Sequence, residues 1–201
     1  MSIGNVRTNN AVKYSTPNLS GFSANVLYGV GEVAGNAALN RTIGLSGDYN
    51  NGPLHVTAAY NRLNTAVAPS AAALKFALIG ATYNFGPVTL AAAYETEKSD
   101  TSALNNRDYL LGVTVPVGPA GAFLASYTRK DDRLVTNTGG KQFGIGYTHS
   151  LSKRTNLYTS YARLTNDAGG RNVVGDASSG GSAVLAGHTS SAVTVGVRHM
   201  F

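Results

Sequence analysis

The stretch Ala192-Val-Thr-Val-Gly-Val-Arg-His-Met-Phe201 ends the chain and decides its fold class. In an extended strand, alternate residues face opposite sides. One face of this strand is apolar or aromatic and the other is small or polar: Val193, Val195, Val197, His199 and Phe201 against Thr194, Gly196, Arg198 and Met200. A strand that presents valines on one side and ends on an aromatic ring is typical of the last strand of an outer-membrane β-barrel.

The composition disfavours a helical membrane protein. The chain has 201 residues, of which 43% are hydrophobic, and its mean hydropathy is −0.06. It contains no run of about 18 apolar residues, the length that a membrane-spanning helix requires. The 24 glycines and 11 tyrosines suit the many turns and the aromatic girdles of a barrel.

Cysteine content and charge exclude several other classes. The absence of cysteine excludes a disulfide scaffold and thiolate metal sites. The net charge is +6, but the basic residues are dispersed and adjacent only at Arg129-Lys130 and Lys153-Arg154, which argues against a nucleic-acid partner. Residues 1–7 have no apolar core of a signal peptide, so we expect further residues to precede them.

Period-2 segments of about ten residues recur along the whole chain, and short and long connectors alternate between them. Outer-membrane barrels sort their connectors in this way, with short periplasmic turns and long external loops. Four of the short connectors carry recognised turn chemistry and 151–154 does not; the long connectors are predicted to be flexible. The predicted strands are 8–16, 21–31, 41–50, 53–63, 73–85, 88–97, 107–117, 121–131, 141–150, 155–165 and 190–201. The short connectors are 16–20, 51–52, 86–87, 117–121 and 151–154, and the long ones are 32–40, 64–72, 98–106, 132–140 and 166–189.

Two strands depart from clean alternation. In 73–85, Leu74, Phe76 and Leu78 have the opposite parity to Ile79, which predicts a bulge or a later start. In 155–165 either parity can be argued, so its faces stay open. Elsewhere the polar faces hold mostly Gly, Ala, Ser, Thr and Asn, as a watery lumen requires.

Three segments resemble the general diffusion porins of Gram-negative bacteria, most closely the beta-proteobacterial branch. They are 10–22, 147–158 and 195–201, and the resemblance covers essentially the whole chain in order. It implies an antiparallel transmembrane β-barrel, a homotrimer and a constriction loop inside the pore. Because 10–17 resembles the strand that follows this loop, we expect residues 1–201 to be a single, N-terminally truncated porin domain, a partial barrel of about eleven strands out of an expected sixteen.

Charged residues on the polar faces are the candidate pore lining. Parity places Arg7, Lys13 and Arg198 inward, and the resemblance implies a basic wall at Arg7 and Lys13. Asp48 and Glu95 also face inward by parity and could set a transverse field across the pore. Glu97 and Asp108 share this parity, although a solvated position at a loop end fits them at least as well.

No catalytic residue, metal ligand or cofactor site is predicted. The four histidines lack ligand spacing, and His199 is expected to be structural. Glu95 and Glu97 could form a carboxylate pair as in glycosidases, but a polar porin wall explains them better. Phe201 resembles the barrel-assembly signal of the family.

The sequence therefore predicts an outer-membrane channel for passive diffusion of small hydrophilic solutes, with a preference for anions. Its expected partners are outer-membrane lipid, lipopolysaccharide, the barrel-assembly machinery, small ions and further copies in a homotrimer. The alternative is a non-conducting barrel that acts as an anchor or adhesin through loops such as 166–189. A soluble β-sandwich is a third possibility.

Overall fold

The computed structural model describes residues 7–65, 72–101, 103–175 and 184–201, and its regular elements are all strands. Those ranges hold no helix with the length and apolar character needed to cross a membrane. The strands are β1 (Ala11–Ser15), β2 (Phe22–Gly29), β3 (Thr42–Asn51), β4 (Leu54–Asn64), β5 (Ala73–Asn84), β6 (Thr89–Ser99), β7 (Asn105–Val117), β8 (Gly121–Asp132), β9 (Gly140–Ser152), β10 (Thr155–Asn166) and β11 (Thr189–His199).

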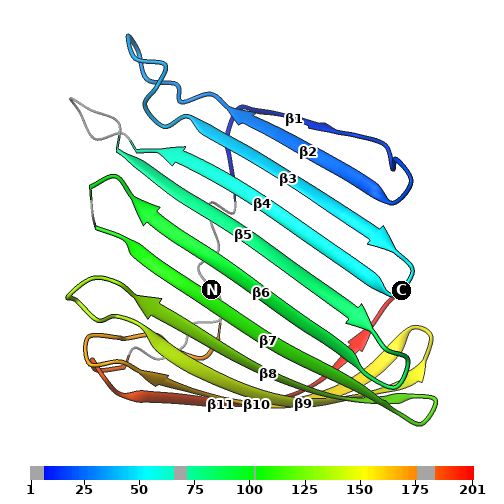
Figure 1. Ribbon diagram of the computed structural model, residues 1–201. Coiled ribbons are helices and arrows are strands. Elements are labelled where there is room, and N and C mark those ends of the chain that lie inside the picture. Colours follow the sequence, from blue (N-terminus) through cyan, green and yellow to red (C-terminus); the bar gives the residue numbers. More distant parts are fainter. Residues whose placement is uncertain (1–6, 66–71, 102, 176–183) are drawn as a thin grey trace. The chain divides into compact units, whose positions relative to one another are not determined.

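The strand order follows the sequence from β1 to β11, so every connection is a hairpin (Figure 1). The registers within β1–β4 and within β8–β11 are antiparallel. All eleven predicted strands are present, which confirms the all-β antiparallel prediction. The largest shift is at β1, which begins at Ala11 rather than at residue 8 because Asn10 has a left-handed backbone with φ of 47°.

The chain divides into two compact units. The first unit comprises Met1–Thr82 and Ala93–Asp108, and the second comprises Tyr83–Ala92 and Tyr109–Phe201. Both are built from strand hairpins. Each is described by itself below.

The first unit separates apolar from polar residues by strand face. One register row runs through Tyr14, Val26, Leu45 and Tyr60, all of which are exposed. The row on the opposite face is polar: the Ser15 hydroxyl donates to Asn25 Oδ1 at 2.6 Å, and Asn25 Nδ2 donates to Ser46 Oγ at 3.1 Å. Alternation along each strand thus produces one apolar and one hydrated surface.

The second unit shows the same separation and decides the faces of β10. Thr159 pairs with Tyr147 on one side and with Val195 on the other, and Tyr161 pairs with Val193. Odd-numbered residues of β10 therefore lie on the valine face of β11. Val193 and Val195 are 71% and 78% exposed.

Few apolar side chains are buried in the described ranges. Leu39, Ala73 and Leu164 make up the buried hydrophobic set, whereas large apolar side chains are exposed on most strands. A soluble β-sandwich buries one face of each sheet in a core. The soluble sandwich is therefore disfavoured, because the apolar faces lack the partner layer that such a fold supplies.

One prediction about the turns is wrong, and one of the two alternatives for 73–85 is removed. β5 begins at Ala73, so Leu74 belongs to the strand and the later start does not occur, while the alternative of a bulge stays a prediction. The turn at 151–154 does have recognised chemistry, because Ser152 Oγ accepts hydrogen bonds from the backbone N–H groups of Arg154 and Thr155 at 3.2 and 3.1 Å. A serine side chain here takes the part that glycine plays in the other turns.

The long connectors after β8 and β10 are linked by hydrogen bonds in the second unit, and their predicted flexibility stays a prediction. The guanidinium of Arg129 donates two hydrogen bonds to the Asp167 carboxylate, at 2.9 and 2.8 Å. Asn172 Nδ2 donates to the Thr138 carbonyl at 3.0 Å. A Cβ on Gly169 would lie 2.0 Å from the Thr136 carbonyl oxygen, so glycine permits a close approach of the two loops. Residues 176–183 of the predicted flexible loop lie outside the described ranges.

Candidate pore-lining residues

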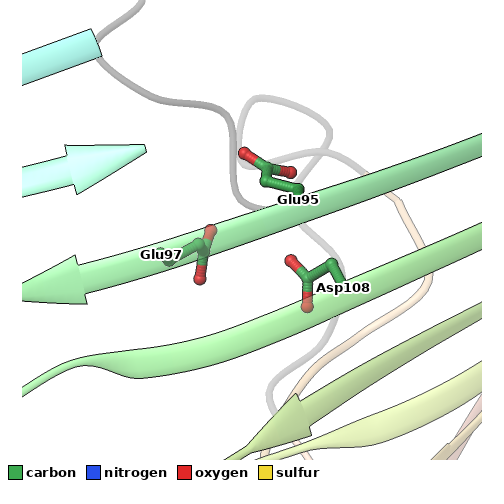
Figure 2. A group of neighbouring side chains, drawn as sticks. All are labelled: Glu95, Glu97 and Asp108. Carbon is green, nitrogen blue, oxygen red and sulfur yellow. The ribbon is translucent and has the colours of Figure 1, made fainter. Parts of the chain in front are cut away.

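Three carboxylates lie together on β6 and β7 in the first unit. Glu95 and Glu97 lie on one face of β6, two residues apart, and Asp108 lies on β7 (Figure 2). One carboxylate oxygen of each lies within 4.8 Å of the others. Asn106 Nδ2 donates to Glu97 Oε2 at 2.7 Å. We call Glu95, Glu97 and Asp108 the acidic cluster.

The acidic cluster is buried, since Glu95 is 5% exposed and both Glu97 and Asp108 are 0% exposed. The predicted solvated loop-end position of Glu97 and Asp108 is therefore wrong. Strand parity gives the face of a residue but not what covers that face, and here the carboxylates lie against one another. Their spacing is one that a hard divalent cation accepts, but grouping alone does not establish a metal site, and the prediction of no metal stays a prediction.

Lys13 lies on the polar face of the first unit. It pairs with Leu27, while its neighbours Val12 and Tyr14 are 75% and 64% exposed on the apolar face. The register thus places Lys13 opposite the apolar surface, as parity predicts. Arg7 is exposed and precedes β1, so strand alternation does not extend to it and the parity argument for this residue does not apply.

Asp48 also lies on the polar face, in β3, and has a basic neighbour that the sequence did not reveal. Its Oδ1 lies 3.5 Å from Nε2 of His55, and both side chains are partly exposed. The two residues come from opposite sides of the β3–β4 hairpin. When protonated, His55 would offset the negative charge of Asp48.

Arg198 and Phe201 lie at the end of the second unit. Arg198 pairs with Asn156 on the face opposite Val197. Phe201 is fully exposed, and its ring meets the His199 ring edge-on with centroids 4.8 Å apart. His199 Nδ1 is 2.8 Å from the Thr155 hydroxyl oxygen, so the contacts of His199 are of the structural kind that the sequence predicts.

The predicted pore-lining residues do not form one cluster. In the first unit they are spread over β1, β3 and β6, and the structure brings Glu95 together with Glu97 and Asp108. Sequence reasoning missed Asn106, although its spacing of two residues from Asp108 places both on one face of β7. It also missed a group of basic and hydroxyl side chains around Arg198, which is described below.

A model of Gram-negative porins matches residues 2–169. The chain belongs to the Gram-negative porin family. The predicted resemblance is therefore confirmed, and so is the outer-membrane location, because the similar proteins are named outer membrane porins.

The similar proteins place this porin near beta-proteobacterial members. Outer membrane porin protein 32 of Delftia acidovorans is 35% identical over 98% of this chain and 57% of its own length. An outer membrane porin protein of Bordetella pertussis is 30% identical, with 100% of this chain and 59% of that protein covered. The chain therefore spans less than two thirds of the length of either relative.

Solved structures support the fold. The anion-selective porin from Comamonas acidovorans aligns with a TM-score of 0.83 and 33% identity, covering 96% of this chain and 60% of that one. The outer membrane protein OmpT of Vibrio cholerae in a trimer form has a TM-score of 0.65 at 16% identity, covering 94% of this chain and 64% of that one, which shows the shared fold alone. The predicted fold class, a partial antiparallel porin barrel, is thus confirmed.

Proposed function

We propose that this porin chain forms part of a water-filled outer-membrane channel through which small hydrophilic solutes diffuse passively. The observation that carries the proposal is the division of each unit into an exposed apolar face and a face of small or polar residues. An apolar outside suits lipid and a polar inside suits a water-filled lumen. We assign no catalytic role to the chain.

The small size of the polar-face residues favours a conducting lumen over the anchor or adhesin alternative. In the second unit, one inner row runs Ser126, Gly144, Ala162 and Ala192. Small non-conducting barrels fill their interior with side chains, and large ones are closed by a plug. Leu124, Tyr158 and Leu164 are among the larger side chains on this face.

Anion preference is part of the proposal. Its support is the 33% identity to a porin that is anion-selective, together with Lys13 and Arg198 on polar faces and a net charge of +6. Basic side chains in a narrow, low-dielectric pore raise the local concentration of anions. The carboxylates of the acidic cluster and of Asp48 would attract cations instead, so the balance between basic and acidic side chains decides the selectivity.

The experiment is a reversal-potential measurement in a planar bilayer under a salt gradient, on the complete porin that contains this chain. We expect anion preference in the wild type and a shift towards zero in Lys13→Gln. Lys98→Gln is the matched control, since Lys98 has the parity opposite to the acidic cluster on β6. Stable, assembled protein without current favours the anchor alternative, and cation preference in the wild type contradicts the anion assignment.

The remaining assignments rest on the same proposal. We infer assembly as a homotrimer in contact with lipid and lipopolysaccharide, and insertion by the barrel-assembly machinery, with Phe201 as the recognised end. The single, N-terminally truncated domain over residues 1–201 also stays a prediction. Each of these properties belongs to the whole porin, of which this chain covers part.

A further inference from the structure

A small basic pocket lies at the turn between β9 and β10 in the second unit, beside the end of β11. Its volume is about 80 Å³, and its lining includes Ser150, Ser152, Lys153, Arg154, Asn156 and Arg198. The register explains the grouping, because Asn156 pairs with Ser150 on one side and with Arg198 on the other. We call it the turn-end pocket.

The three cations of the turn-end pocket lack a compensating carboxylate. Within the ranges that the structure describes, no acidic group lies at ion-pair distance from Lys153, Arg154 or Arg198. Other basic residues of the chain are paired, such as Arg129 with Asp167. Like charges gathered around one small space create a positive potential that an anion would relieve.

The pocket also presents hydrogen-bond donors, both neutral and charged. Ser152 Oγ already accepts two backbone N–H groups, so its own hydrogen must point elsewhere. The Arg198 guanidinium contacts the Met200 sulfur at 3.9 Å, a weak acceptor that leaves most of its donors uncommitted. Hydroxyl donors and guanidinium forks around a cation cluster match the several acceptor oxygens of a phosphate-type anion.

The size of the turn-end pocket limits what it can hold. A volume of about 80 Å³ equals that of two or three water molecules at roughly 30 Å³ each. A single tetrahedral oxyanion fits this space. A nucleotide or a sugar ring is too large to be enclosed by it.

The pocket opens on the polar face rather than towards lipid. Arg198 and Asn156 form one register pair, and the next pair, Val197 with Leu157, is exposed on the apolar face. Adjacent residues of a strand point to opposite sides. The accessible ligand is therefore a water-soluble anion and not a lipid headgroup.

We propose that the turn-end pocket is a binding site for a phosphate-type tetrahedral oxyanion. In porins the short turns face the periplasm, so the site would hold the anion at the periplasmic mouth, where it enters or leaves the channel. This goes beyond charge-based diffusion, because it assigns a discrete, saturable site. It rests on the strands of the second unit and does not require that the chain conducts.

The test is a titration of the complete, detergent-solubilised porin with inorganic phosphate, followed by the ³¹P NMR line width at low chloride. Saturable broadening is expected for the wild type. Arg198→Gln and the double variant Lys153→Gln/Arg154→Gln each remove charge-assisted hydrogen bonds, so we expect phosphate affinity to fall about tenfold or more. Arg171→Gln, with the same loss of charge on an exposed loop of the same unit, should bind as the wild type does.

A further variant and an experiment with added lipid distinguish binding at the pocket from a general effect of charge and from misfolding. Ser150→Ala keeps the charge and should weaken phosphate binding several-fold, with circular dichroism verifying its β-structure. Phosphatidylglycerol added to the micelles should leave phosphate binding unchanged. Three results would overturn the proposal. They are wild-type protein that shows no saturable phosphate binding, pocket variants that bind phosphate as tightly as Arg171→Gln does, and phosphate that is displaced by phosphatidylglycerol. Binding is read without ion flux, so a failed channel and a failed pocket are separate results.

Discussion

Asp132 shows how one carboxylate organises a loop. Its oxygens accept hydrogen bonds from the Leu134 and Thr138 N–H groups and from the Thr136 and Thr138 hydroxyls, at 2.7–2.9 Å. Residues 129–132 are all charged, which places this end of β8 beyond the apolar layer. Burial opposes ionisation of Asp132, but the hydrogen bonds from Thr138 and the others outweigh it and lower its pKa from 3.8 to about 2.

This shift predicts acid sensitivity of the 133–139 loop. A folded pKa below the unfolded value contributes stability that is present above about pH 4 and is lost as the pH falls through about 2. Asp132→Asn should lose this contribution, on the order of 1 kcal/mol once solvent screening is allowed for, and its loop amides should exchange hydrogen faster than those of the wild type at pH 6. The difference should shrink towards pH 2. Asp131→Asn is the control, since Asp131 accepts one exposed contact from Arg133, and equal exchange in the two variants would contradict the assignment.

At the scale of one element, β11 offers a direct comparison of its two faces. Val195 is 78% exposed on the apolar face, whereas Thr194 pairs with Ser160 on the other face. An arginine on the lipid side near the middle of the membrane costs roughly 2–4 kcal/mol, whereas lumen positions tolerate charge. Val195→Arg should therefore reduce the free energy of unfolding in vesicles, measured with urea, much more than Thr194→Arg. Similar losses in the two variants would argue that β11 does not face lipid.

Period-2 alternation predicted the elements well because it repeats over about ten residues in each strand. Alternation did not predict a strand boundary that depends on one backbone conformation. At Asn10 the positive φ delays the start of β1. It could not choose the faces of 155–165, since both sets of residues contain apolar and polar members. The hydrogen-bond register with Val193 and Val195 supplied that information.

For the candidate site, the sequence predicted which face of a strand each residue lies on, but not which residues lie close together. Parity assigned Lys13 and Asp48 to the faces on which the register also places them, because a face follows from one strand alone. The proximity of Glu97 to Asp108 depends on the register between two strands, and the contact of Ser152 with its turn depends on side-chain direction. Neither contact can be predicted from the alternation within a single strand.

For the whole molecule, the exposed end of the chain should matter for assembly rather than for conduction. Phe201 is fully exposed and contacts the His199 ring. If it is the recognised end, Phe201→Ser in the complete porin should lower the assembled fraction in outer membranes, measured by heat-modifiable migration in gels. Met200→Ser, one residue away, should leave that fraction near the wild-type level. The channels that the Phe201→Ser variant does form should conduct normally, and unchanged assembly would refute the signal role.

The linkage of the two loops after β8 and β10 has a consequence for immune recognition and sequence drift. Besides the Arg129–Asp167 ion pair, the Asp167 and Gly169 N–H groups donate to the carbonyls of Gly139 and Asn137. A surface made from both segments would form a conformational epitope, which antibodies raised against a linear peptide from either segment would recognise poorly. Insertions in one segment would also need compensating changes in the other, so the two should diversify together.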